Sequence, residues 1–202
     1  MDGTFVAIPP MELYSAAYHG NAPAIKKLLA RGANKHFRHP HGGATALYVA
    51  CEFGHHEVAK LLIEANARPD EARDDGATPL VKACQDGGKL EIARLLLEAG
   101  AEVNKQDTHG MTPLWVACHQ ATGARVTPTT IRSPQPRPLS RVQGRTELVK
   151  VLLKAGADPL KRMQGWSPLD LAWRNGRDEI AKELLAALSP EEREKARIPR
   201  EP

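Results

Sequence analysis

The sequence predicts an all-α solenoid in which about five helix–turn–helix repeats are joined by β-hairpin-like loops. Three observations predict this class. A short phrase recurs along the chain, each copy is followed by a second apolar pattern with helical spacing, and aromatic residues make up only 4% of the 202 residues. A core built mainly from Ala, Leu, Val and Ile suits closely spaced helices better than a β-sandwich.

The recurring phrase marks the first helix of each repeat. It reads GATALYVAC, GATPLVKAC, GMTPLWVAC and GWSPLDLAW in turn, and its Thr or Ser recurs after 33, 34 and 55 residues. A hydroxyl at this position can accept a hydrogen bond from an early helical N–H, and the proline that follows in three copies has a φ suited to the first turn. We therefore expect helices to begin directly after Thr45, Thr78, Thr112 and Ser167.

A second helix follows each phrase after a tight turn at a glycine. Its first turn carries an acid, as in Glu57 and Glu91, which is favourable near the positive end of the helix dipole. It ends at another glycine, or in the second repeat at Asn66, and asparagine is the non-glycine residue that best tolerates a left-handed conformation. A degenerate earlier copy, LYSAAYHGNAPAIKKLLARGA, begins at Leu13 and adds a fifth repeat.

These repeats define the expected domain organisation. We assign residues 1–10 to an N-terminal tail, 11–188 to the repeat domain and 189–202 to a polar C-terminal tail of frayed helix or disordered chain. The repeats span about 11–38, 39–72, 73–106, 107–162 and 163–188. One outer-helix position is charged only in the first and last repeats, at Lys27 and Glu183, as expected for a stack with two capping ends.

The long spacing of 55 residues comes from an insertion, residues 121–143, between the two helices of the fourth repeat. By the logarithmic rule, closing the longer turn costs roughly 1.7 kcal/mol, which a folded domain can tolerate. The segment is rich in proline, has no acid and carries four arginines, which equal the net charge of +4. We expect a disordered loop there beside a neutral repeat body.

Two stretches, DDGATPLVKACQDGG…EIARLLLEAGAEVN (Asp74 to Asn104) and DTHGMTPLWVAC (Asp107 to Cys118), resemble the ankyrin repeat family. The resemblance covers roughly residues 13–188. It implies a protein-binding module without chemistry, which presents its first helices and hairpin tips along one concave face. The usual histidine after Thr-Pro-Leu is replaced here by Tyr48, Val81, Trp115 and Asp170, which leaves in question the hydrogen bond from that ring to the neighbouring loop.

The resemblance maps the variable positions of the binding face onto this chain. Tyrosine and tryptophan are over-represented among interface hot spots. Tyr48 and Trp115 have an equal alternative, in which they fill the vacated histidine position and pack between repeats, whereas we expect Trp166 to be exposed in its hairpin. The candidate partner-binding residues are Tyr14, Tyr18, Tyr48, Glu52, Phe53, Lys82, Gln85, Asp86, Met111, Trp115, His119, Trp166 and Arg174.

An alternative function is a regulatory module whose insertion carries phosphorylation or docking motifs. Thr127 and Ser133 each precede a proline, and Ser140 follows an arginine by three residues. Phosphate at such sites would cancel local charge and could create a docking peptide. A neutral insertion, or an error in the gene model, explains the same segment.

Metal binding is a third and more distant alternative. Six of the eight histidines lie in the first 56 residues, among them His36, His39 and His41 on one hairpin, with His55 and His56 nearby. No carboxylate or cysteine completes a fixed ligand set, so we expect no metal. The three cysteines, Cys51, Cys84 and Cys118, share one repeat position and are expected to be free, buried packing residues.

Other functions find little support in the sequence. There is no Gly-rich phosphate loop, HExxH motif or placed nucleophile, so we expect no enzyme activity, cofactor or small-molecule substrate. One arginine-bearing loop without interleaved aromatics does not predict nucleic-acid binding. The start has an acid at position 2 and no apolar run long enough for a signal peptide or membrane span, so we expect an intracellular protein, cytoplasmic or nuclear, with a protein partner of unknown identity.

Overall fold

The computed structural model describes residues 9–85, 89–119 and 139–196. Within these residues the chain forms eleven α-helices and no β-strand, apart from one isolated antiparallel bridge between Met163 and Trp166. The predicted all-α repeat fold is therefore confirmed. The chain divides into two compact units, Met1–Ala83 with Glu91–Glu102, and Cys84–Leu90 with Val103–Pro202.

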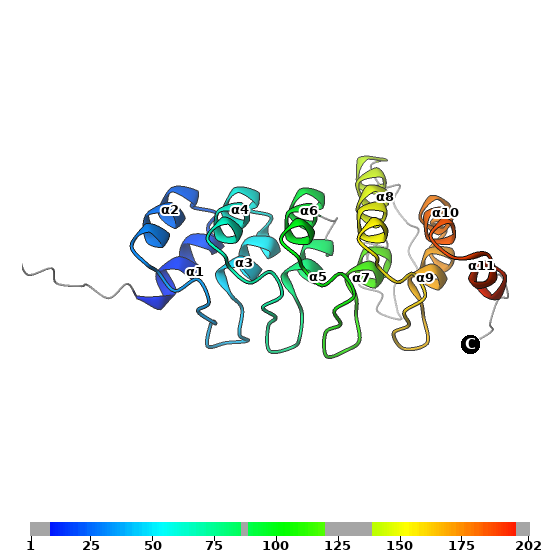
Figure 1. Ribbon diagram of the computed structural model, residues 1–202, viewed down its shortest axis with the longest axis horizontal. Helices are drawn as coiled ribbons and strands as arrows, with labels where there is room; N and C mark the ends of the chain where they lie inside the picture. Colours follow the sequence, from blue (N-terminus) through cyan, green and yellow to red (C-terminus); the bar gives the residue numbers. More distant parts are fainter. Residues whose placement is uncertain (1–8, 86–88, 120–138, 197–202) are drawn as a thin grey trace, which may run out of the picture. The chain divides into compact units, whose positions relative to one another are not determined.

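The first unit is built from helix pairs in two layers. Its helices are α1 (Pro10–Tyr18), α2 (Ala22–Ala30), α3 (Ala46–Phe53), α4 (His56–Glu64), α5 (Pro79–Cys84) and α6 (Leu90–Glu98). The last residue of α5, Cys84, and the first residue of α6, Leu90, are assigned to the second unit. Helix α1 packs on α2 within a repeat and on α3 of the next, while α2 packs on α4. Figure 1 shows α1 and α3 in one layer and α2 and α4 in the other, so first helices pack on first helices.

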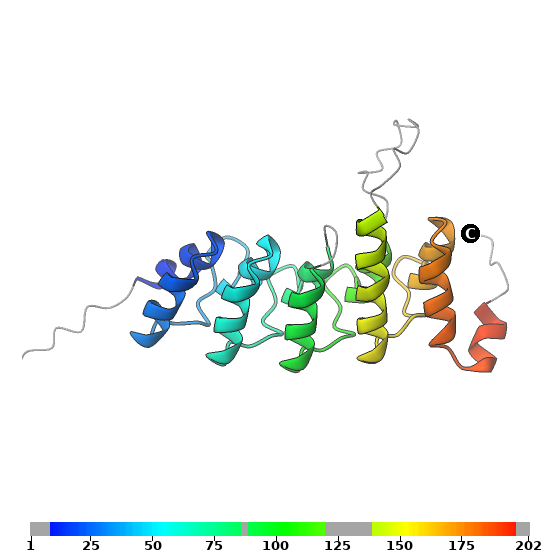
Figure 2. The same cartoon turned by 90° about the horizontal axis from the view of Figure 1, so that it is seen from above.

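The second unit repeats the same arrangement. Its helices are α7 (Pro113–His119), α8 (Leu139–Lys154), α9 (Pro168–Arg174), α10 (Asp178–Ala186) and α11 (Pro190–Ala196). Helix α7 packs on α8 and α9, and α10 packs on α8 and α9. The view in Figure 2 shows α8 and α10 side by side, α8 extending further than α10 at one end.

Every expected first-helix cap in repeats two to five forms as the sequence predicts. The hydroxyl of Thr45 accepts a hydrogen bond from the N–H of Tyr48 at 3.1 Å, and Thr78 and Thr112 make the equivalent bond at 3.2 Å. At Ser167 the cap is reciprocal, because the Asp170 carboxylate also accepts from the Ser167 N–H at 2.8 Å. These bonds satisfy helix N–H groups that would otherwise be buried without partners.

The turns that end the helices adopt the expected left-handed backbone. Gly54 closes α3 with a φ of 79°, and Asn66, the predicted exception to the glycine rule, has a φ of 62° after α4. The glycine expected to close α5, Gly87, lies outside the described residues.

The core between the helices is lined by small side chains. Ala17, Ala50, Ala83 and Ala117 have no exposed surface, so neighbouring first helices can approach closely. The three cysteines at the next position are buried and free, as predicted. Burial raises the pKa of Cys118 to about 12, and raises that of Cys84, so neither thiol is a nucleophile at neutral pH.

Two segments differ from the sequence-based expectation. Helix α8 begins at Leu139, so the last five residues of the predicted insertion are helical. Between Pro138 and Pro159 the sequence holds no proline that would stop a helix, and Gly144 alone does not break it. The polar tail forms α11, because Ser189 and Glu192 make a reciprocal cap in which the Ser189 N–H donates to the Glu192 carboxylate at 2.8 Å.

Candidate functional site

The predicted partner-binding residues fall into two sets, one in each unit. Tyr14, Tyr18, Tyr48, Glu52, Phe53 and Lys82 belong to α1, α3 and α5 of the first unit. Gln85, Met111, Trp115, His119, Trp166 and Arg174 belong to the second unit, and Asp86 lies outside the described residues. Exposure and contacts separate residues that can meet a partner from residues that hold the fold.

Tyr48 is buried, which favours the alternative in which it packs between repeats. Its side chain is 2% exposed and packs against Ala44 and Ala77, with Tyr14 against the same cluster. The Arg73 guanidinium lies 5.6 Å over its ring. Burial raises the pKa of Tyr48 to about 12. A bulky ring at the vacated histidine position therefore fills the space between successive hairpin loops.

Trp115 is likewise buried, and only 7% of it is exposed. Its Nε1–H donates a hydrogen bond to the backbone oxygen of Trp166 at 3.1 Å. The link from first helix to neighbouring loop, which the sequence left in question, is thus made by an indole in place of an imidazole. The burial of Trp115 therefore favours the alternative in which it packs between repeats, as it does for Tyr48.

Tyr18 and Phe53 form an exposed aromatic surface on the first unit. Their rings lie 4.6 Å apart between centroids, and the residues remain 45% and 47% exposed. The His55 ring holds the end of α1, because its Nε2 lies 3.0 Å from the Tyr18 backbone oxygen, and it also stacks beside Phe53. Two large aromatic side chains therefore pack on each other while a little under half of each residue stays exposed to solvent.

Charged side chains beside this surface are paired. The Lys82 ammonium lies 3.0 Å from the Glu52 carboxylate, and both side chains are largely buried. Tyr14 lies half-buried against the His39 ring at 4.6 Å.

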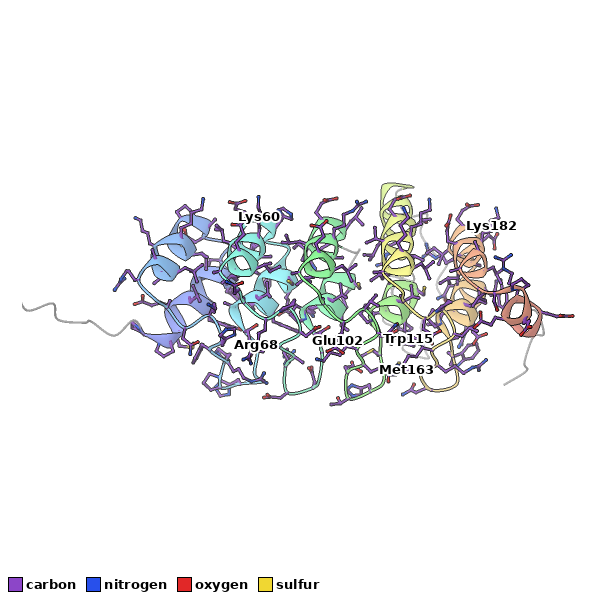
Figure 3. The ribbon with its side chains drawn as sticks, in the orientation of Figure 1. Lys60, Arg68, Glu102, Trp115, Met163 and Lys182 are labelled. Atoms are coloured by element: carbon purple, nitrogen blue, oxygen red, sulfur yellow. The ribbon has the colours of Figure 1, made fainter. Side chains whose placement is uncertain are left out.

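The second unit combines aromatic and cationic groups. The Arg174 guanidinium lies 4.7 Å from the centroid of the half-buried Trp166 ring, as expected for a cation–π contact. His119 is exposed and stacks almost parallel on Trp115 at 4.6 Å, and partial burial lowers its pKa below the usual value. Trp115 and Met163, which frame this region on α7 and on the loop before α9, are labelled in Figure 3.

Arg145 is a structural residue that the sequence analysis did not identify. Arg145 is buried, and its Nη1–H donates to the backbone oxygen of Ala117 at 3.2 Å, at the end of α7. It occupies the same repeat position as His55, which binds the Tyr18 carbonyl, and as Lys89 and Arg177. The signal was available, since four successive repeats carry a basic residue or histidine two residues before the acid of the second-helix pattern.

The histidine-rich hairpin makes ordinary structural contacts. His36 Nδ1 lies 3.1 Å from a carboxylate oxygen of Glu71, and the His41 N–H donates to the His39 ring at 3.1 Å. No cluster of three or more His, Cys, Asp or Glu side chains that could hold a metal ion occurs in the described part of the chain. Of the candidate phosphorylation sites, Thr127 and Ser133 lie outside the described residues, and Ser140 lies in α8 with its side chain undescribed.

The fold defines an all-α protein of repeated helix pairs, and comparison with known families agrees. A family model described as ankyrin repeats, three copies, matches residues 13–107 and 66–125. The chain belongs to the ankyrin repeat family. Ankyrin repeats are generally protein–protein interaction modules and are typically non-catalytic. No curated protein matches the chain.

Among the residues that the structure describes, none of the helices combines the length and the apolar character needed to cross a membrane.

Proposed function

We propose that the chain is a non-catalytic, intracellular scaffold or adaptor that binds a protein partner through its first helices and hairpin loops. The observation that carries the proposal is the exposed aromatic surface formed by Tyr18 and Phe53. Exposed aromatic side chains at fixed positions lose little conformational entropy on binding and bury a large apolar area. Tyr48 and Trp115 are left out of the proposed surface because both are buried.

The proposal is tested by removing the aromatic surface without disturbing the fold. The Tyr18→Ala/Phe53→Ala double variant truncates two exposed rings, and surface changes of this kind usually alter stability by less than about 0.5 kcal/mol each. A matched control is Lys60→Ala on the outer helix α4, labelled in Figure 3, since Lys60 is exposed and makes only a long ion pair with Glu64. All variants are first compared by thermal unfolding.

Quantitative affinity purification then measures which partners each variant captures, and titration with the purified partner measures its affinity. We expect partners captured by the wild type to be lost from the double variant and retained by Lys60→Ala, with at least a tenfold loss of affinity in the titration. Equal capture and affinity for wild type and double variant would exclude Tyr18 and Phe53 as the docking surface.

A further inference from the structure

Arg174 is an exposed arginine whose guanidinium has no acidic partner among the residues that the structure describes. Its guanidinium makes no ion pair or hydrogen bond with any of the residues that the structure describes, and it lies over the Trp166 ring, 4.7 Å from the ring centroid. The residue is exposed at the end of α9. A guanidinium offers five N–H donors in a planar fork that matches a carboxylate, so its edge is available to one.

The usual intrahelical partner of Arg174 is occupied elsewhere. Asp170 lies four residues earlier on the same helix face, where an Asp–Arg ion pair would be expected. Its carboxylate instead accepts hydrogen bonds from the Ser167 N–H at 2.8 Å and the Ser167 hydroxyl at 2.7 Å, and it lies 3.7 Å from Arg162. Asp170 is thus bonded in the helix cap and does not pair with Arg174.

The loop that carries the Trp166 ring is held by three hydrogen bonds to its backbone. The backbone oxygen of Trp166 accepts hydrogen bonds from Trp115 Nε1 and from the Met163 N–H, and the Trp166 N–H donates to Met163. These bonds fix the loop that carries the ring, and the ring orients the guanidinium. A preorganised group binds its ligand with little loss of freedom.

We propose that Arg174 and Trp166 form a receptor for an Asp or Glu side chain of the protein partner, within a segment that alternates acidic and apolar residues. The inference rests on the proposed protein-binding function and adds the chemistry of the partner. The carboxylate binds the guanidinium edge, and the neighbouring apolar side chain packs on the half-buried Trp166 and Met163.

The experiment uses the full chain and a capped peptide, acetyl-(Glu-Leu)3-amide, with acetyl-(Gln-Leu)3-amide as the uncharged probe. Nuclear magnetic resonance follows the Arg174 Nε–H and Trp166 indole N–H signals, and fluorescence anisotropy of the labelled peptide gives the affinity. The variants are Arg174→Gln and Arg174→Lys. Arg94→Gln on the outer helix α6 is the control, because it removes the same charge from an exposed site.

We expect the Glu peptide to shift both signals in a saturable way and the Gln peptide to leave them in place. Arg174→Gln is expected to weaken binding by about tenfold or more, and Arg174→Lys by less, because it keeps the charge but loses the planar fork. Arg94→Gln should bind like wild type. Equal weakening by Arg174→Gln and Arg94→Gln, or no saturable shift, would overturn the proposal.

Two competing ligands complete the test. Tighter binding of the same peptide with phosphoserine in place of glutamate, or displacement of the Glu peptide by a twelve-nucleotide oligo(dT), would assign the site to phosphate and overturn the carboxylate proposal. Partner capture that depends on Tyr18 and Phe53 but not on Arg174 would refute this inference alone and leave the proposed function standing.

Discussion

Replacing Trp115 by phenylalanine tests whether the buried indole links α7 to the loop before α9. The change removes the hydrogen bond from Nε1 to the Trp166 oxygen, for which the net cost is about 0.5–1.5 kcal/mol. It also removes about three heavy atoms from a side chain that is 7% exposed, which costs roughly 1.5 kcal/mol more in lost burial. The expected loss in the free energy of unfolding is therefore about 2–3 kcal/mol.

Urea unfolding followed by circular dichroism measures this loss, and hydrogen exchange of the amides of residues 163–166 locates it. For a chain of this size the change corresponds to a fall in melting temperature of about 4–12 °C. Trp173→Phe is the matched control, since Trp173 is 40% exposed and should cost less than about 0.5 kcal/mol. Stability equal to wild type in Trp115→Phe, or faster exchange spread evenly over both units, would refute the link.

Three further predictions concern the turns, the thiols and one histidine. Asn66→Gly should leave stability nearly unchanged, whereas Asn66→Ala should cost about 1–2 kcal/mol at a φ of 62°, and equal urea midpoints for both would contradict this. The buried thiols should react with Ellman's reagent only after unfolding, so a fast reaction of the native protein would be evidence against their burial. Burial lowers the pKa of His119, so between that pKa and the unfolded value near 6.5 the unfolded chain binds more protons and stability falls as pH drops. Unfolding midpoints at pH 7, 6 and 5 should decline more in wild type than in His119→Gln, and parallel declines would count against the shift.

The parts of the fold that the sequence predicted are those governed by local chemistry. A hydroxyl before a helix has one early N–H within reach, so the caps at Thr45, Thr78 and Thr112 follow from spacing alone. The left-handed turn at Asn66 is local in the same sense. Such features depend on a few neighbouring residues and need no knowledge of tertiary packing.

The candidate site was predicted less well because exposure depends on contacts between distant residues. Tyr48 and Phe53 lie on the same helix, yet Tyr48 is buried by loop residues from the next repeat while Phe53 is exposed. Ser167 and Arg174 compete for the Asp170 carboxylate, and in the structure it accepts from the Ser167 N–H in the cap of α9. Arg174 is therefore left without this acid as a partner. Helical spacing identifies the residues on a face but cannot say which of them neighbouring loops will cover.

The bond between Arg145 and the Ala117 carbonyl has a consequence for how the chain can vary. It joins the last turn of α7 to α8 directly, through residues on either side of the segment 120–138. Residues could be added to or deleted from that stretch at a small entropic cost, while the helices keep their partners. The sequence between α7 and α8 can therefore vary in length at a low cost in stability.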